Sequence, residues 1–193
     1  MLPVSLNVLL LEPWYVGSHR QWADGWAASS RHRVRVMGET NDRWRRSLQT
    51  TPAAFAERLA QWRGRIHCVV ASTPIDLAAL LGIGRRKLAG IPCVLYMHES
   101  QIGYPAGPKG GRADAAIATD WRAMLAADRV MVASSHHKHA IASALPDFVK
   151  ALHGDASAIG NHTADLVSGI EVLPLGLELP RPHNRERHGP LKI

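Results

Sequence analysis

Short apolar runs alternate with segments of helical periodicity along most of this chain. Residues 4–11 form a nearly continuous apolar run, as expected for a strand that is covered on both faces. Phe55, Leu59 and Trp62 recur instead at the spacing of one helix face. This alternation predicts an α/β fold in which right-handed crossovers build a parallel sheet flanked by helices. The predicted strands are 4–11, 34–37, 66–71, 91–97, 130–133 and 170–173.

Capping residues predict where several helices begin. Ser18 and Gln21 have the spacing of a capping box, which places the start of a helix at Ser18. Thr51 suits the N-cap position of another helix, with Pro52 at its first helical position. Further helices are predicted from Thr73-Pro74, over residues 113–126, and from a Ser134 cap to about Leu145.

The length of 193 residues predicts one domain of good size. We expect residues 1–180 to form a Rossmann-like domain, and residues 181–193 to be a linker that leads into a missing C-terminal domain. No apolar run approaches the roughly 20 residues that span a bilayer, and the N-terminus lacks a basic leader. Cys68 and Cys93 fall in predicted core strands, as expected for reduced thiols in a cytoplasmic protein.

The chain is strongly basic, with a net charge of +7 and a pI near 10.0. This charge favours a polyanionic partner such as RNA, or a substrate that bears phosphate. Part of it lies in Arg181, Arg185, Arg187 and Lys192, where a solvated linker would also be basic.

A polar loop with the sequence EPWYVGSHRQ follows the first predicted strand, at residues 12–21. Gly17 allows a ligand to approach the backbone, and the helix start at Ser18 favours an anion. His19 and Arg20 add hydrogen-bond donors in the first turn. The alternative is a capped helix after a tight turn. Neither a dinucleotide fingerprint nor a phosphate loop is present, which argues against nicotinamide or ATP chemistry.

A second polar loop follows the strand predicted at 91–97. His98 and Glu99 offer a base or donor beside a carboxylate, although His98 could equally be satisfied by local backbone. The segment lacks the second histidine of a zinc-protease motif. Glycines at 103–111 suit a lid that closes on substrate. Ligands of parallel α/β sheets bind at this edge, so both loops are candidate site segments.

Two other clusters carry weaker signals. Three arginines surround Trp44 at residues 43–46, where guanidinium groups can bind phosphates while the ring stacks on a base, or the segment can be an exposed basic turn. His136, His137 and His139 suggest a metal, but no acidic or cysteine partner is nearby, which favours a solvated helix start. Ser134 and Ser135 could direct this helix start toward a ligand.

These residues resemble the N-terminal half of the tRNA-queuosine mannosyltransferase family, also called glycosyltransferase-like domain-containing proteins. The likeness is carried by EPWYVGSHRQ at 12–21 and YMHESQIGYP at 96–105. DRWRR at 42–46 and VASS at 132–135 occur in matching order. The resemblance extends to about Pro180. Two motifs in the expected order are more specific than either alone.

The resemblance implies a retaining, GT4-like hexosyltransferase of the GT-B type, in which this chain is the N-terminal, acceptor-side domain. GDP-mannose would donate mannose to queuosine in tRNA-Asp, without a cofactor or a metal. The second domain would hold most of the nucleotide sugar, and residues 1–193 lack its acidic motif. We therefore expect the isolated chain to be inactive and no membrane to be involved.

The same resemblance implies roles for individual residues. His98 and Glu99 would be catalytic, with His98 on the transferred sugar, and Gly17, Ser18 and His19 would face the donor phosphate or sugar. The acceptor or tRNA contacts would be Arg43, Trp44, Arg45, Arg46, Gln101 and Tyr104. Two alternatives stay open: a non-catalytic RNA-binding module, and a glycosyltransferase domain for another acceptor.

Overall fold

The computed structural model describes residues 5–40, 43–103, 111–153 and 158–176. Six strands within these residues form one sheet in the order β2-β1-β3-β4-β5-β6, and every neighbouring pair is parallel. The strands are β1 (Asn7–Glu12), β2 (Arg33–Gly38), β3 (Cys68–Ser72), β4 (Cys93–Met97), β5 (Arg129–Val132) and β6 (Glu171–Val172).

Seven helices connect or flank these strands in the described residues. They are α1 (Gly17–Ser29), α2 (Trp44–Ala60), α3 (Leu77–Ile83), α4 (Arg85–Leu88), α5 (Gly111–Ala126), α6 (Ser135–His153) and α7 (Ala158–Ser168). The arrangement confirms the predicted α/β, Rossmann-like parallel sheet flanked by helices. Because β2 and β3 lie on opposite sides of β1, the strand order reverses there, and parallel sheets bind ligands beside such a reversal.

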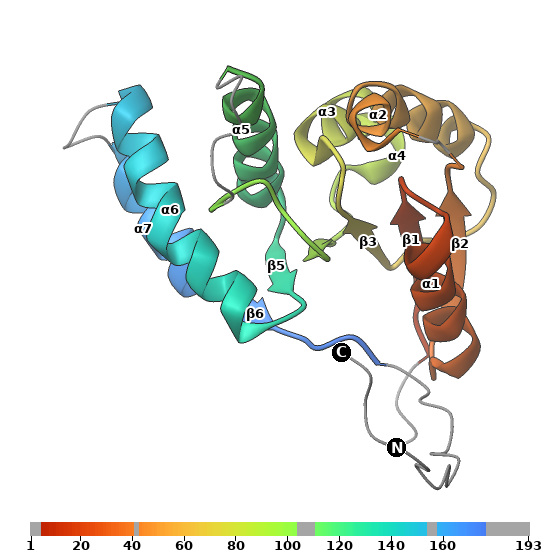
Figure 1. The fold of residues 1–193 in the computed structure, drawn as a ribbon. Helices are drawn as coiled ribbons and strands as arrows, with labels where there is room; N and C mark the ends of the chain where they lie inside the picture. The colour runs from red at the N-terminus through yellow and green to blue at the C-terminus, as the bar shows by residue number, and fades with distance from the viewer. Residues whose placement is uncertain (1–4, 41–42, 104–110, 154–157, 177–193) are drawn as a thin grey trace, which may run out of the picture.

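Side chains of β1 alternate between two apolar clusters, one on each face of the sheet. Leu9 and Leu11 join the larger cluster, which includes Phe55 of α2. Val8 and Leu10 join the smaller one, which α1 covers through Ala23 and its tryptophans. Figure 1 shows α2, α3 and α4 on one side of β1 and β3, with α1 on the other side. Burial on both faces explains the unbroken apolar run of this strand.

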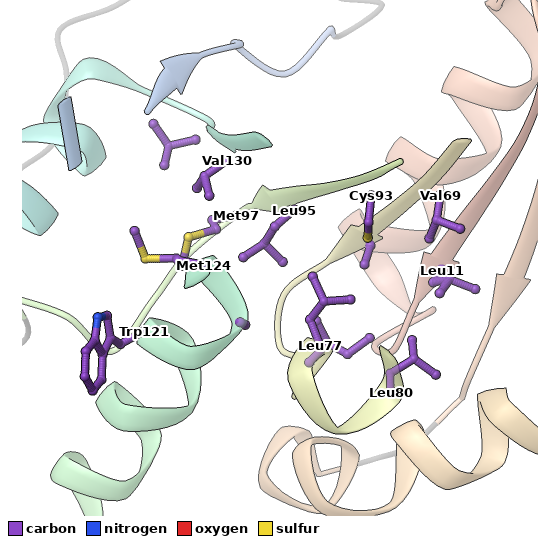
Figure 2. Packing of buried hydrophobic residues seen from close by; sticks show 14 of the residues in the cluster. Leu11, Val69, Leu77, Leu80, Cys93, Leu95, Met97, Trp121, Met124 and Val130 are labelled. Carbon is purple, nitrogen blue, oxygen red and sulfur yellow. The ribbon is translucent and has the colours of Figure 1, made fainter. Parts of the chain in front are cut away.

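The larger cluster continues across the sheet toward β5. In Figure 2, Leu77 of α3 lies beside strands β3 and β4, and Met97 and Met124 point toward one another. Cys93 is buried in this cluster and its thiol is free. Burial raises the pKa of that thiol to about 12, so Cys93 acts here as a small apolar side chain.

The predicted starts of the helices at Ser18 and Thr51 are wrong. Helix α1 begins at Gly17 after Val16, and no side chain caps it. Gly17 has a φ of 52°, so the glycine itself turns the chain into the helix one residue before Ser18. Helix α2 begins at Trp44 and continues through Pro52. Thr51 is buried inside α2, and its hydroxyl has no hydrogen-bond partner within the part of the chain that the structure describes.

Two further helix boundaries also differ from expectation. Helix α3 begins at Leu77 rather than at Thr73-Pro74, because the Asp76 carboxylate accepts a hydrogen bond from the Ala79 N–H. The Ser134 cap is confirmed, since its hydroxyl accepts from the His137 N–H at 3.1 Å. Helix α6 nevertheless runs to His153, well beyond Leu145. Helices α4 and α7 were not predicted.

The predicted domain boundary near residue 180 and the linker at 181–193 lie outside the described residues, so both stay predictions. Among the described helices, none combines the length and apolarity that a membrane span requires.

Replacing Phe55 by Ala tests how α2 is anchored to the sheet. Phe55 is completely buried, so its removal leaves a cavity and we expect about 3–5 kcal/mol less free energy of unfolding. Urea denaturation followed by circular dichroism measures this loss. Ile83→Ala is the control, because Ile83 is 60% exposed and its truncation should cost about 0.5 kcal/mol or less. Equal losses in both variants would contradict the packing described.

Candidate active site

The carboxylate of Glu12 is the centre of a polar cluster at the end of β1. It is fully buried. Its Oε1 accepts hydrogen bonds from the backbone N–H of Trp14 at 2.9 Å and from His19 Nδ1 at 3.1 Å. Its Oε2 accepts from the Ser72 hydroxyl at 2.6 Å. His98 Nε2 lies 3.7 Å from Oε2, which is an ion-pair distance rather than a hydrogen bond.

Strand order brings these residues together. Glu12 ends β1, Ser72 ends the neighbouring strand β3, and His98 follows β4. Parallel strands end at the same edge, so their terminal side chains meet there. His19 reaches the same point from the first turn of α1. The chain folds back to it through a short turn in which the Val16 N–H donates to the Trp14 carbonyl.

The pKa of Glu12 is lowered to about 2. Burial alone would raise the pKa, but the contacts from His19 and His98, the charge of His19 and the Ser72 hydroxyl together outweigh it. Glu12 is therefore ionised at neutral pH and can only accept hydrogen bonds. It follows that the Nδ1 atom of His19 carries the proton of the hydrogen bond to Glu12.

The His98 ring is held in place by three rings. Its centroid lies 4.3 Å from His19, 4.4 Å from Trp22 and 4.9 Å from Tyr96, with the Trp22 ring nearly perpendicular at 88°. Tyr96 stacks on Trp22 and donates its hydroxyl to the Leu173 carbonyl at 2.8 Å. The side chain of His98 is 8% exposed.

His98 Nε2 is buried and has no hydrogen-bond partner among the described residues. A buried polar atom in this state costs about 1–3 kcal/mol. Such a cost is expected at sites where the missing partner is supplied by a bound ligand. The ring is therefore fixed in orientation and has one nitrogen available for hydrogen bonding.

Backbone contacts fix the loop that carries His98. The Thr73 hydroxyl accepts from the His98 N–H at 3.2 Å and donates to the Glu99 carbonyl at 3.0 Å. Further along, the Gln101 N–H donates to Asp120 Oδ2 of α5 at 2.9 Å. Thr73, directly after β3, and Asp120 of helix α5 thus hold the two ends of residues 98–101.

Two ionisable side chains hydrogen-bond to this loop, the buried Asp120 and the half-buried His137. Burial raises the pKa of Asp120 to about 7, the charge of Glu99 adds to this, and the Gln101 N–H opposes it. Burial also lowers the pKa of His137, whose Nε2 lies 3.0 Å from the Ser100 hydroxyl. Of the three histidines in the predicted 136–139 cluster, only His137 is drawn into the loop, whereas His136 and His139 are exposed.

The two predicted loops meet, but only some of their predicted site residues do. His19 and His98 are in direct ring contact. Gly17 and Ser18 are exposed at the start of α1, and a Cβ atom on Gly17 would meet nothing within 4 Å. Glu99, predicted to be catalytic, is exposed, and in the described residues no hydrogen bond or ion pair joins its carboxylate to the cluster.

The predicted acceptor contacts lie partly outside the described region. Arg43 and Arg46 are exposed, and the Arg43 carbonyl accepts from the Arg46 N–H as α2 begins. Gln101 is half-buried. The side chains of Trp44 and Arg45, and the whole of Tyr104, are outside the described residues. All the assigned roles stay predictions.

The sequence pattern placed Glu12 in the first polar loop but indicated no role for it. Ser72 and Trp22 were not predicted to be site residues. Glu12 carried a usable signal, since it is a charged residue directly after the unbroken apolar run of a buried strand. A carboxylate in that position is buried only if it finds partners. Ser72 carried no comparable signal, because its role depends on which strand lies beside β1.

The cluster also has a donor set that a metal could use. The ligand atoms of Glu12, His19 and His98 lie within 4.8 Å of one another. Two imidazoles and a carboxylate suit zinc, but binding would replace the contact between His19 and Glu12. The expectation that no metal is required stays a prediction.

Comparison with known proteins identifies the family. The family model for the tRNA-queuosine alpha-mannosyltransferase N-terminal domain matches residues 7–177. The chain belongs to this family. A tRNA-queuosine alpha-mannosyltransferase from Drosophila melanogaster is 28% identical over 100 residues. That match covers 51% of this chain but 26% of the relative, so the chain spans about a quarter of the relative's length. No solved structure matches the chain significantly.

The Glu12→Gln variant tests the low pKa of Glu12, because that pKa makes the free energy of unfolding depend on pH. A carboxylate whose pKa is lowered on folding stabilises the protein above its unfolded pKa, near 4.5, and loses this effect as the pH falls toward about 2. At about 1.4 kcal/mol per pH unit, the stability advantage of wild type over Glu12→Gln should shrink by about 3 kcal/mol across this interval. Urea denaturation at several pH values measures it.

Asp165→Asn is the matched control, because it removes one exposed carboxylate from α7. A difference between wild type and Glu12→Gln that is constant from pH 4.5 to 2 would contradict the electrostatic account of Glu12.

Proposed function

We propose that this chain is the N-terminal domain of a retaining glycosyltransferase that transfers mannose from GDP-mannose to queuosine in tRNA-Asp. Membership of the family supports the class of reaction. An active site here is supported by the state of His98. Three neighbouring rings orient its side chain, and its buried Nε2 lacks a hydrogen-bond partner among the described residues. It lies where Rossmann-like sheets bind their ligands.

His98 Nε2 is proposed to bind a hydroxyl of the transferred mannose. Glu12 Oε2, 3.7 Å away, is too distant for a hydrogen bond, so a proton on this nitrogen would be free to be donated to the sugar. The sugar hydroxyl would occupy the position that the described residues leave without a partner. A bond of this kind positions the reacting sugar, which is a large part of catalysis in group transfer.

The donor diphosphate is proposed to lie at the start of α1. Gly17 leaves open space, and the first N–H groups of this helix have no side-chain cap. Together with the helix dipole and His19, these groups would stabilise the negative charge that develops on the diphosphate as its bond to the sugar breaks.

The proposed step balances without an enzyme nucleophile. The bond between the anomeric carbon and the diphosphate oxygen breaks, and its electron pair leaves with GDP. The queuosine hydroxyl oxygen bonds to the anomeric carbon on the same face, and its proton passes to the departing phosphate oxygen. In this scheme Glu12 remains ionised, and its role is to orient His19 and His98.

The acceptor is proposed to be tRNA, with Arg43 and Arg46 contacting its phosphates. Both side chains are exposed near the edge that carries the cluster, and the net charge of +7 favours a polyanion. The protein is proposed to be cytoplasmic.

His98→Ala in the full-length protein tests the catalytic proposal. Loss of a donor that positions the sugar should lower turnover of queuosine-containing tRNA-Asp about 100-fold or more, while affinity for the tRNA stays within twofold. Mannosylated tRNA is quantified by mass spectrometry, and binding by fluorescence anisotropy. His162→Ala, at an exposed histidine of α7, should behave as wild type. Undiminished turnover in His98→Ala would rule out its catalytic role.

The 193-residue chain alone provides a second test. The family model that it matches describes an N-terminal domain, so we expect no mannosylated product when the chain is incubated with GDP-mannose and queuosine-containing tRNA-Asp. The full-length protein is the positive control. Robust turnover by the chain alone would refute the proposal that a second domain supplies part of the site.

A further inference from the structure

A group of arginines lies at the opposite edge of the sheet from Glu12. Arg33 and Arg35 of β2 and Arg65 after α2 line a hollow of about 130 Å³ with the indole of Trp62. We call these four residues the β2 arginine surface. The hollow is lined by the first residues of β1, Asn7 to Leu9, which precede Glu12 by three to five residues, or about 10–17 Å at about 3.3 Å per residue.

The backbone sets the spacing of these side chains. Arg33 pairs with Asn7 of β1 and Arg35 pairs with Leu9, so the two guanidinium groups stand on the same face of β2. The Arg35 guanidinium lies over the Trp62 ring, 5.6 Å from its centroid. Gly64 turns the chain between Trp62 and Arg65 with a φ of 104°, and a Cβ atom on it would meet nothing within 4 Å. The hollow is therefore open beside Gly64.

Negative charge is absent from the segments that build this surface. Residues 25–38 and 58–75 contain arginines but no aspartate or glutamate. In the described part of the chain, four other arginines face acidic partners, whereas Arg33, Arg35 and Arg65 form no ion pair. Exposed like charges repel one another, and a bound anion relieves this repulsion.

We infer that the β2 arginine surface binds the phosphate backbone of RNA, an inference that rests on the proposed function. Guanidinium groups bind phosphate oxygens in pairs, with a geometry that lysine lacks. A hollow of 130 Å³ is smaller than the roughly 300–1,000 Å³ of small-molecule sites, so it suits one phosphate group of a longer polyanion.

The distance from Glu12 fits a large nucleic acid. Small RNA-binding domains contact duplexes over about 16 base pairs, so one RNA ligand can reach both edges of the sheet. Contacts to phosphates fix register and orientation without reading sequence. The β2 arginine surface thus orients the RNA, while the cluster at the other edge acts on one nucleoside.

Binding of a fluorescein-labelled, unmodified tRNA-Asp transcript to the 193-residue chain tests the inference. The double variant Arg33→Gln/Arg35→Gln should bind about tenfold more weakly at moderate salt, and the slope of log affinity against log salt should fall by about 2. The matched control Arg122→Gln/Arg129→Gln removes the same charge from arginines that already face acids, and its affinity should stay within twofold.

Equal weakening in both double variants would overturn the inference, because binding would then follow net charge alone. An unchanged affinity in Arg33→Gln/Arg35→Gln would also overturn it. Self-association of that variant alone, seen by size-exclusion chromatography with tRNA affinity unchanged, would show that the arginines instead protect the edge strand from pairing.

Transfer by the full-length protein separates this inference from the proposed function. Arg33→Gln/Arg35→Gln should raise KM for tRNA and leave kcat unchanged, since neither residue touches the reacting groups. If wild type transfers mannose but the variant has a normal KM, the surface is not used and the proposed function stands. If wild type transfers nothing and the variant still loses tRNA affinity, the proposed function fails and the surface stands.

Discussion

The buried carboxylate of Glu12 is the constraint on which the candidate site depends. A charge in this position is stable only because three different segments supply donors to it: the turn after β1, the first turn of α1 and the end of β3. Each donor also restricts its own segment, so the burial of one group orders the whole edge. His98 joins the assembly from β4 through its 3.7 Å approach to the same carboxylate.

The two histidines differ in how they hydrogen-bond to this carboxylate. His19 donates from Nδ1 to Glu12, whereas the Nε2 atom of His98 faces the carboxylate without a hydrogen bond. Aromatic rings on the remaining sides of His98 prevent it from turning to find a partner elsewhere. The His98 Nε2 atom therefore stays unsatisfied within the described residues, in the place where a substrate would be most strongly oriented.

Sequence periodicity predicted the sheet well, because a strand buried on both faces must be apolar throughout. The strand predicted at 66–71, for example, is β3 at Cys68–Ser72, which is buried over nearly its whole length. Helix starts were less predictable, since Gly17 and Asp76 took the roles that Ser18 and Thr73 suited equally well. The meeting of His19 and His98 followed from their positions after parallel strands. The partnership of Glu12 with Ser72 did not, because it depends on the order of strands in the sheet.

The hydrogen bond from Tyr96 to the carbonyl of Leu173 has a mechanical consequence. The Tyr96 ring lies against both Trp22 and His98, so the chain that follows β6 is linked to the ring beside the unsatisfied imidazole. The Leu173 N–H also donates to the Val132 carbonyl of β5 at 2.9 Å, so a displacement of this segment would reach β5 as well as His98. The position of the segment that follows β6 is therefore coupled to the position of the His98 ring.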